Sequence, residues 1–500
     1  MISMKKITVT DIINVENIKK WESGDTIVIS AGTGTGKSHF VKNKLAAFAS
    51  SKNKKILFLI HRSRTVGQFR AEIEREGKSH IVDVRTYQSL EAKLRKNEKI
   101  DFSEYAYIVS DEFHYFLSDS AFNKFTDMSL RAILDTNTAV KIFMSATGDD
   151  TLKYIENIEK ANIKEKYSIS SNYDYINSIN FYNNVDTLKE LMYKWIENGE
   201  KALIFIQSDS KAYDLYREFE EYSVFNCSKN NKDYYRYVDE EKIEEILSNE
   251  KFENQFLITT TAMDAGVNII DLELHNIVVD IKNIGSLIQA VGRKRIQNSN
   301  DTVNLYVKNI IDKELNLMEG NLGNRIKMAK FLKDNGDKKF IEEYYRRNDT
   351  SGIIYLDSDF TLRINKLMYN NTLISMLENS CMKNKGKNGY AKFILEKFGK
   401  ENDEVVVLEG KKRESSIEEY LEKLFEDKVV MLTKDDRTEL VEKIDARANG
   451  RRLSKIGSLN SALDELNIPY RICEFMTNRV IDGKKKKFKA AWKIDKIFSY

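Results

Sequence analysis

Residues 26–38 read Thr26-Ile-Val-Ile-Ser-Ala-Gly-Thr-Gly-Thr-Gly-Lys-Ser38, a short apolar run that leads directly into a glycine-rich loop. The run is rich in branched side chains and too short for a buried helix, which is typical of a buried strand. A helix is expected to begin at the end of the loop. This order of strand, glycine loop and helix predicts a phosphate-binding loop.

The residue types in the loop suit the phosphates of a nucleoside triphosphate. Glycines allow backbone N–H groups to surround phosphate oxygens, and the N-terminus of the following helix adds a favourable dipole. Lys37 is expected to place a positive charge on the same oxygens, and the Ser38 hydroxyl to ligate Mg²⁺. The strict motif opens with glycine, whereas this chain has Ala31 there. The nucleotide-binding residues expected in the loop are Gly32, Thr33, Gly34, Thr35, Gly36, Lys37 and Ser38.

Similar apolar runs surround the loop and predict an α/β fold with parallel sheets. They occupy residues 55–60, 105–110 and 141–145, and the pattern restarts at residues 201–206, 255–259 and 276–280. A polar segment rich in Asn and Tyr, around residues 160–180, is the expected linker. The sequence therefore predicts two similar lobes, residues 1–175 and 176–312.

An acidic string, Asp111-Glu-Phe-His114, follows the apolar run that ends at Ser110. A pair of carboxylates at a strand end is what hydrolysis of a magnesium nucleotide requires. Asp111 is expected to hold the Mg²⁺, and Glu112 to orient and polarise the attacking water. On its own such a pair is often only a helix cap, but together with the glycine loop it predicts a nucleotide hydrolase.

With these motifs the chain resembles the superfamily 2 helicases of the DExH type, and in particular phage, plasmid and restriction-type members. The resemblance covers roughly residues 20–300. In chain order the matching segments are residues 31–38, 61–64, 85–88, 111–114, 145–147, 205–208, 260–269 and 289–295. The resemblance implies two RecA-like P-loop lobes that close on ATP and Mg²⁺. The residue pattern beyond them predicts a mainly helical C-terminal extension.

The resemblance also implies roles for residues of the second lobe. Gln289, Arg293 and Arg295 match the family positions that complete the catalytic site from the far side of the nucleotide. The usual spacing of the two arginines would place the second at position 296, where this chain has Ile296, so the division of their roles stays open. Asp264 and Gly266 match positions that bridge nucleotide and nucleic acid.

Nucleic-acid contacts follow from the same resemblance, because family members hold one strand across both lobes through its phosphates. Hydroxyl, amide and guanidinium groups at these positions suit contacts that do not depend on base sequence. The expected nucleic-acid-binding residues are Arg62, Arg64, Thr86, Gln88, Gln207 and Thr260.

The last third of the chain has a different pattern. Charged stretches with helical spacing predict a helical extension with a small hairpin over residues 313–440. Residues 441–500 are expected to form a basic module, because residues 471–500 hold nine basic and three acidic residues, a formal charge of +6. A helix followed by a basic hairpin around Asp482-Gly483 resembles a winged-helix module, and a solubilising loop tip is an equal alternative.

The overall composition excludes several classes of protein. A formal net charge of +3 among 500 residues excludes a globally basic coat protein. The three cysteines form no CxxC pair, which argues against a zinc site or a disulfide framework. No apolar run approaches the ~18 residues of a membrane span, and the N-terminus has no secretory pattern. A cytoplasmic protein without a membrane partner is expected.

Taken together, these features predict an ATP-dependent DNA helicase that uses ATP and Mg²⁺. DNA is favoured over RNA because the residues 266–268 and 292–295 resemble the phage and restriction-type members. Two alternatives stay open: a duplex translocase that does not separate strands, and a nucleic-acid-binding protein whose ATPase depends on a partner. The C-terminal region is the expected docking place for a protein partner.

Overall fold

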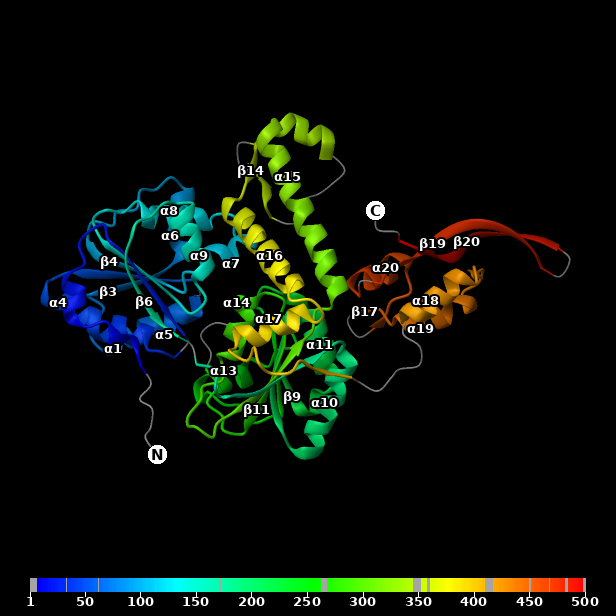
Figure 1. The fold of residues 1–500 in the computed structure, drawn as a ribbon, viewed down its shortest axis with the longest axis horizontal. Coiled ribbons are helices and arrows are strands. Elements are labelled where there is room, and N and C mark those ends of the chain that lie inside the picture. The colour runs from blue at the N-terminus through cyan, green and yellow to red at the C-terminus, as the bar shows by residue number, and fades with distance from the viewer. Residues whose placement is uncertain are drawn as a thin grey trace.

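The computed structural model arranges the chain as two α/β lobes, a helical extension and a small C-terminal module (Figure 1). The described residues are 7–32, 34–61, 63–170, 172–261, 268–344, 352–357, 360–409, 417–448, 451–466, 468–481 and 484–497. Both lobes contain a parallel sheet of the RecA-like type, so the predicted fold class is confirmed. Of the helices in these ranges, none is long and apolar enough to cross a membrane.

The first lobe is built on six parallel strands in the order β3-β2-β4-β5-β1-β6. These are β1 (Thr26–Ala31), β2 (Lys55–Ile60), β3 (Val82–Thr86), β4 (Tyr105–Asp111), β5 (Val140–Ser145) and β6 (Ile163–Ile169). Strands β1, β2, β4 and β5 coincide with the apolar runs of the sequence. Strands β3 and β6 lie at the two edges, where half-exposed residues leave no continuous apolar run.

Helices cover both faces of the first sheet and bury two separate apolar clusters. Ile27 and Ile29 of β1 point into one cluster and Val28 into the other, as the alternation of a strand requires. The helices are α1 (Val9–Ile12), α2 (Val15–Lys19), α3 (Lys37–His39), the π-helical turn Phe40–Leu45, α4 (Ala46–Ser51), α5 (Ser63–Arg75), α6 (Tyr87–Arg95), α7 (Tyr115–Ser118), the short helix Asp119–Ala121, α8 (Thr126–Leu134) and α9 (Asp149–Asn157).

The second lobe is a seven-stranded parallel sheet in the order β15-β7-β12-β11-β8-β10-β9. Its strands are β7 (Ile176–Tyr182), β8 (Lys201–Ile206), β9 (Ser223–Asn226), β10 (Phe256–Thr259), β11 (Leu274–Asp280), β12 (Val303–Lys308) and β15 (Val406–Leu408). Its helices are α10 (Val185–Asn198), α11 (Asp209–Glu218), the short helix Glu220–Tyr222, α12 (Lys232–Tyr235), α13 (Glu240–Asn249) and α14 (Ile284–Val291).

Two details of the second lobe differ from the prediction. Most of the expected linker around residues 160–180 forms the edge strand β6 and the strand β7, whose polar residues lie on exposed positions. Strand β15 belongs to residues 313–440, which the sequence placed outside this lobe, yet it pairs with β7. The chain returns to the sheet because residues Tyr390, Ile394 and Phe398 are buried in the core of the second lobe.

The helical extension fastens the two lobes to each other. It comprises α15 (Asp312–Tyr344), the expected hairpin of β13 (Ile354–Leu356) and β14 (Leu362–Ile364), α16 (Lys366–Asn384) and α17 (Gly389–Lys397). Helix α16 lies between the lobes (Figure 1). Leu367 at its start is buried in the core of the first lobe, and Met382 at its end in the core of the second. The Asn365 amide also donates to the Ser120 carbonyl at 2.9 Å.

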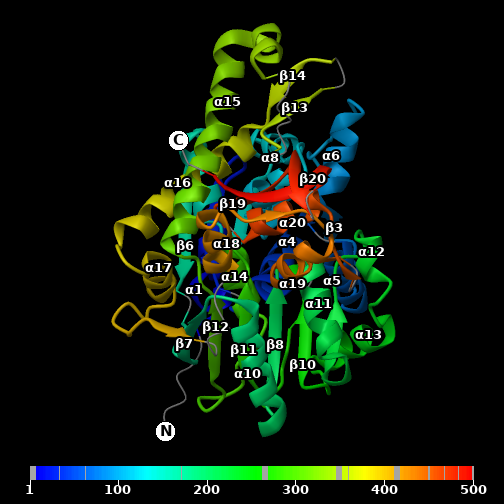
Figure 2. The same ribbon diagram turned by 90° about the vertical axis from the view of Figure 1, so that its right-hand side faces the viewer.

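The C-terminal module stands to one side of the lobes and faces the viewer in Figure 2. In chain order it contains α18 (Ile417–Glu426), β16 (Val430–Met431), the short helix Asp435–Arg437, α19 (Thr438–Ile444), β17 (Arg447–Ala448), β18 (Arg451–Arg452), α20 (Ile456–Glu465), β19 (Tyr470–Ile481) and β20 (Lys484–Lys496). Its three-stranded antiparallel sheet has the order β16-β20-β19.

The module has a hydrophobic core of its own, which corrects the expected boundary between residues 440 and 441. Leu421, Met431 and Leu440 pack in one cluster with Leu459 and Trp492. A boundary at residue 440 would divide this cluster, so the module in the structure begins with α18. The sequence did not show this because α18 has the same charged helical pattern as the extension before it.

The start of α17 provides a test of how tightly the extension is packed. A Cβ atom added at Gly389 would lie 1.9 Å from the Met382 carbonyl oxygen at the end of α16, a backbone atom that cannot rotate away. We expect Gly389→Ala to cost about 1–3 kcal/mol of stability through overpacking, measured as a lower melting temperature by circular dichroism.

Gly457→Ala is the matched control for this substitution. Gly457 lies in the first turn of α20 with no atom within 4 Å of an added Cβ, so alanine there should be neutral or stabilising by about 0.5–1 kcal/mol. Equal melting temperatures for the two variants would contradict the tight junction between α16 and α17.

Candidate nucleotide-hydrolysis site

The glycine-rich loop lies between β1 and the helix that begins at Lys37. Gly34 and Gly36 have φ of 76° and 83°, in the left-handed region where glycine is favoured. The Thr35 hydroxyl donates to the Gly32 carbonyl at 2.7 Å and closes the loop. The backbone therefore has the compact curve that the sequence predicted for a phosphate-binding loop.

A short N-terminal segment supports this loop from outside. The Val9 N–H donates to the Thr35 carbonyl at 2.9 Å, and Lys44 Nζ donates to the carbonyl oxygens of Thr10 and Ile13 at 2.5 and 3.0 Å. Sequence reasoning assigned no role to residues 7–20. The signal was weak because α1 and α2 are each only one turn long.

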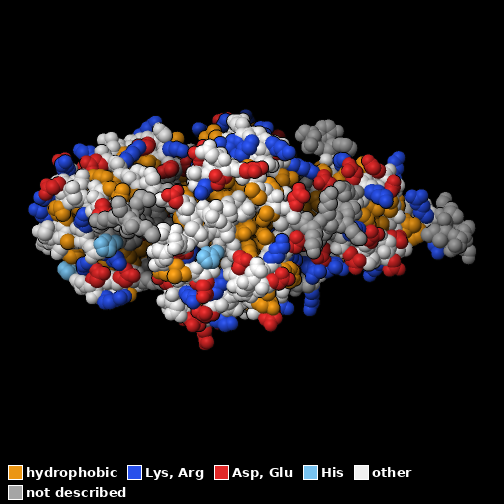
Figure 3. Space-filling model, turned by 60° about the horizontal axis from the view of Figure 1, so that its bottom comes forward, with side chains coloured by type: hydrophobic (Ala, Val, Ile, Leu, Met, Phe, Trp, Pro, Cys, Tyr) orange, Lys and Arg blue, Asp and Glu red, His pale blue; other side chains and the backbone are white. Residues whose placement is uncertain are grey.

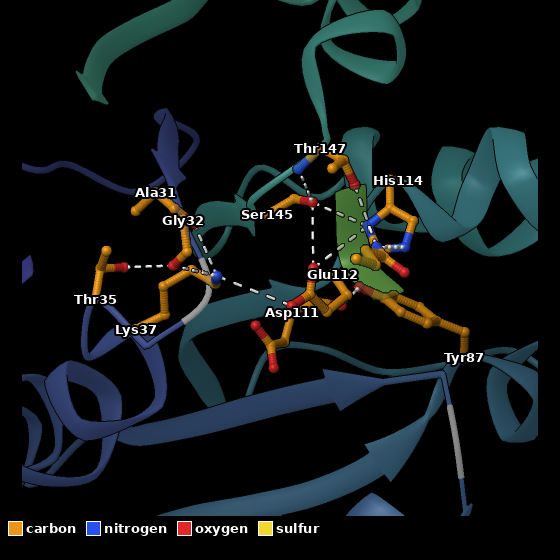
Figure 4. A network of polar contacts seen from close by, with 11 residues as sticks. Ala31, Gly32, Thr35, Lys37, Tyr87, Asp111, Glu112, His114, Ser145 and Thr147 are labelled. Carbon is orange, nitrogen blue, oxygen red and sulfur yellow. Dashed lines mark hydrogen bonds and ion pairs between the residues drawn. The ribbon is translucent and has the colours of Figure 1, made fainter. Parts of the chain in front are cut away.

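Lys37 points from the loop toward the acidic string at the end of β4, which is separated from β1 by β5 in the sheet (Figure 4). Its Nζ donates to the carbonyl oxygens of Ala31 and Gly32 at 2.8 and 3.3 Å. The same atom lies 3.9 Å from Glu112 Oε1. The side chain is buried, so this positive charge acts in a poorly solvated environment, where its electrostatic effect is large.

The acidic pair lies at the carboxyl end of β4, where the backbone is strained. Glu112 has a φ of 49°, a left-handed value that is uncommon outside glycine and is found at functional sites. Asp111 is buried, and its Oδ1 accepts no hydrogen bond from the described residues. A buried carboxylate oxygen of this kind fits the coordination of a hard cation such as Mg²⁺, and Ser38 lines the same pocket.

The two carboxylates differ in their ionisation. Burial, together with the adjacent Glu112 charge, raises the pKa of Asp111 to about 7. Burial also opposes ionisation of Glu112, but the positive charges of Lys37 and Arg293 and a hydrogen bond from His114 outweigh it and lower the pKa of Glu112. Glu112 is thus held ionised, as a group that polarises water must be.

A chain of hydrogen bonds runs from Glu112 to the second lobe. The Ser145 hydroxyl donates to Glu112 Oε2 at 3.2 Å, and His114 Nδ1 lies 2.9 Å from the Ser145 Oγ. The Gln289 amide of α14 donates to His114 Nε2 at 2.9 Å and to the Thr147 Oγ1 at 3.2 Å. Because the Gln289 amide donates to Nε2, that nitrogen of His114 has no proton. The imidazole proton is therefore on Nδ1, which donates a hydrogen bond to the Ser145 Oγ.

The pocket that holds these groups has a volume of about 290 Å³ and walls from both lobes. Its lining residues are Gly34, Gly36, Lys37, Ser38, His39, Ile60, His61, Asp111, Glu112, His114, Asn268, Gln289, Arg293 and Arg295. All six residues predicted as catalytic therefore meet in one place. His39 and His61 also line the pocket, and the sequence analysis assigned neither of them a role.

Arg293 and Arg295 are positioned by the residue between them. Lys294 points away from the pocket and forms a fully buried ion pair with Asp301, at 2.7 Å. On the pocket side, Arg295 Nε donates to the Asn268 Oδ1 at 2.7 Å. Backbone hydrogen bonds from Ile269 to Arg293 and from Arg295 to Ile269 join the two segments like paired strands. The pairing and Lys294 were not apparent from the sequence.

The expected nucleic-acid residues lie at the carboxyl ends of strands in both sheets. Thr86 ends β3 and caps α6, and Gln88 is exposed on the first turn of that helix. Gln207 follows β8, is exposed, and accepts from the Lys282 N–H at 3.1 Å. Thr260 follows β10 but is buried, so its side chain does not reach the surface.

Some predicted residues cannot be placed. Thr33, Arg62, Asp264 and Gly266 lie outside the described residues, as does the side chain of Arg64. Within the ranges that are described, no group of three or more His, Cys, Asp or Glu residues is arranged to hold a metal ion. A cation in this pocket would therefore need ligands beyond the carboxylates.

Most of the second lobe matches a known protein family. Residues 183–296, from the end of β7 to the arginines of the pocket, match the family described as the helicase conserved C-terminal domain. This match covers the second lobe only, and it agrees with the motifs that the sequence shows there. The restriction-type subgroup stays a prediction.

Several solved structures are similar to this chain. DEAD-box helicase Mss116 bound to ssRNA and UDP-BeF is 15% identical, with 78% of this chain and 85% of that chain covered and a TM-score of 0.47. The S. cerevisiae Dbp5 bound to RNA and ADP BeF3 is 14% identical, with 58% and 80% covered and a TM-score of 0.41. The Mycobacterium smegmatis helicase Lhr bound to ssDNA and AMP-PNP is 15% identical, with 62% and 46% covered and a TM-score of 0.40. No curated protein matches the sequence.

The raised pKa of Asp111 predicts a pH-dependent gain in stability for Asp111→Asn. Between pH 3.8, the ordinary pKa of Asp, and about pH 7, Asp111 is protonated in the folded protein but ionised in the unfolded chain. The free energy of unfolding therefore falls as the pH rises through this range. We expect Asp111→Asn to raise the melting temperature of the nucleotide-free protein in EDTA near pH 8, and to have little effect near pH 5.

The neighbouring variant Glu112→Gln is the control, because the opposite sign is expected for it. The pKa of Glu112 is lowered, so its charge stabilises the fold above its ordinary pKa, and the neutral amide should lower the melting temperature near pH 8. Shifts of the same sign for both variants would contradict the assigned ionisation states.

The contact between Gln289 and His114 predicts that the two side chains act as one unit. We expect Gln289→Ala and His114→Ala each to lower kcat for ATP hydrolysis about 5- to 10-fold, equivalent to one hydrogen bond. The double variant should be no slower than either single variant, since both remove the same bond. Effects on kcat that simply multiply would show that the bond is not used in the working enzyme.

Proposed function

We propose that this protein is an ATP-dependent DNA helicase of the DExH type, in which ATP hydrolysis between the two lobes drives movement along a strand. The observation that carries the proposal is the hydrogen-bonded path from Glu112 in the first lobe to Gln289 in the second. A pocket assembled from both lobes responds to any change in their separation, and it therefore couples hydrolysis to lobe movement.

The proposed hydrolysis assigns a task to each charged group in the pocket. Glu112 orients and polarises a water molecule that attacks the γ-phosphorus of ATP, and the products are ADP and inorganic phosphate. Lys37 and Arg293 neutralise the charge that develops on the phosphate oxygens. Arg293 is the better candidate for this task than Arg295, because Arg295 is bound to Asn268 and lies between the two segments of the second lobe.

A magnesium ion is part of the proposal, with Ser38 and Asp111 as its protein ligands. Both residues line the pocket, and the buried Asp111 oxygen without a hydrogen bond supports the assignment. When bound, the ion would neutralise charge on the β- and γ-phosphates. Its ligation would also favour the ionised form of Asp111, against the effect of burial.

The proposed track crosses the carboxyl ends of the strands in both lobes. Gln88 and Gln207 are exposed there, and Thr86 lies beside Gln88 at the start of α6. Polar uncharged groups at these positions suit phosphate contacts that do not depend on base sequence. The preference for DNA rests on the resemblance of residues 266–268 and 292–295 to phage and restriction-type members.

Steady-state ATP hydrolysis with different polymers tests the proposal. We expect single-stranded DNA to stimulate hydrolysis more than duplex DNA or single-stranded RNA, since a strand that spans both lobes favours their closure on ATP. In Glu112→Gln, kcat should fall at least ~100-fold, because the group that polarises water is lost while the fold and nucleotide site remain. An absence of stimulation by every polymer would contradict the helicase.

A strand-displacement assay then separates the helicase from its closest alternative. A duplex with a single-stranded tail should be unwound by the native chain with ATP and not by Glu112→Gln. Stimulation by duplex DNA without strand displacement would indicate a duplex translocase instead.

A further inference from the structure

The C-terminal module separates its charges between two surfaces. Residues 417–446, which form α18 and α19, contain ten acidic and five basic residues. Residues 470–497, which form the β19–β20 hairpin, contain nine basic and three acidic residues. Because the module as a whole is nearly balanced in charge, the segregation itself indicates that the hairpin has a use for positive charge.

The outer half of the hairpin extends beyond the core of the module. Near its base, Ile472, Trp492 and Ile494 are buried in that core. From Thr477 to Arg479 and from Lys486 to Lys489, every described side chain is exposed or half-exposed. In Figure 1 the hairpin points away from both lobes, and in Figure 3 the module forms the narrow end of the molecule, where basic side chains are visible.

The basic side chains described in this outer half are not paired with carboxylates. Within the described part of the chain, Arg479, Lys486, Lys487 and Lys489 form no ion pair, whereas the basic residues Arg471, Lys493 and Lys496 at the base are all paired. Arg479 lies directly opposite Lys486 in the hairpin register. Like charges at such a position destabilise a hairpin, and an anion that spans both strands removes the repulsion.

We propose that the C-terminal module binds duplex DNA through the outer half of the β19–β20 hairpin, which contacts the phosphates on either side of a groove. A two-stranded ribbon fits the major groove of B-form DNA, whereas the deep, narrow major groove of duplex RNA does not admit it. The exposed side chains described in this half are basic or polar, and Phe488 is half-buried, so this half of the hairpin offers no open stacking platform for single strands.

The helices of the module are not part of this site. The exposed residues on α20 include Asp464 and Glu465, whose carboxylates would repel a phosphate backbone. The two acidic helices α18 and α19 would do the same. The order of helices and strands, with the small sheet β16-β20-β19, supports the winged-helix-like interpretation of the sequence, but with contact through the wing alone.

This site is separate from the pocket between the lobes, so its test does not depend on hydrolysis. The full-length chain without nucleotide is titrated onto a fluorescent blunt DNA duplex at several KCl concentrations. In the variant that combines Arg479→Gln, Lys486→Gln, Lys487→Gln and Lys489→Gln, we expect weaker binding. The slope of log Kd against log salt should also fall by roughly 3–4, at about 0.9 for each phosphate that is no longer neutralised.

A matched control variant neutralises four exposed lysines of the first lobe, at the edge of its sheet where the strands begin. Lys52, Lys54, Lys96 and Lys99 precede β2 and β4, at the amino ends of the strands. Their replacement by Gln changes the net charge equally and should leave the salt slope unchanged. Circular dichroism and ATP hydrolysis stimulated by single-stranded DNA should be native-like in both variants, since neither change touches the pocket.

The same pair of variants distinguishes this proposal from its alternatives. An unchanged affinity and salt slope for duplex DNA in the hairpin variant would overturn the proposal. The proposal would also be overturned if the hairpin variant kept its affinity for duplex DNA and lost affinity for duplex RNA or phosphatidylglycerol vesicles instead. Failure of single-stranded DNA to stimulate hydrolysis would count against the helicase and leave the hairpin result intact.

Discussion

Two adjacent carboxylates in a buried pocket are the constraint around which this structure is organised. Asp111 and Glu112 repel each other and are poorly solvated, so they need compensating positive charge. Lys37 supplies part of it from the same lobe, and Arg293 of the other lobe supplies another part. Because one lobe cannot complete the site alone, the chemistry depends on how the two lobes sit against each other, and the remaining elements serve to set that relation.

Several contacts fix the position of the two lobes relative to each other, some in the pocket and some outside it. The bond between Gln289 and His114 joins the lobes within the pocket. The buried pair of Lys294 and Asp301 fixes the segment that presents the arginines, at a place where either charge alone would be strongly destabilising. Further out, α16 is anchored in both cores, which limits how far the lobes can separate. The C-terminal module has its own core and is tied to α15 by the ion pair of Lys313 and Glu418.

Prediction from the sequence was most complete where local pattern and chemistry coincide. The central strands of both sheets were found because burial on both faces makes them continuous apolar runs. The phosphate-binding loop was found because its glycines, Lys37 and Ser38 occur at a fixed spacing. Edge strands such as β3 and β6 were missed, since one half-exposed face breaks the run. The boundary of the C-terminal module was missed because a helix carries no mark of the core to which it belongs.

The sequence by itself predicted the kind of chemistry, because few residue types can bind phosphates and polarise water. Within each motif these residues also lie only a few positions apart. The family resemblance also predicted that a second lobe would provide arginines, although not which one faces the acidic pair. Only the tertiary structure decided that Lys294 lies between them as a buried anchor, that β15 completes the second sheet, and that the basic hairpin is set apart from acidic helices. These features depend on contacts between segments tens or hundreds of residues apart, and no local pattern of residues records them.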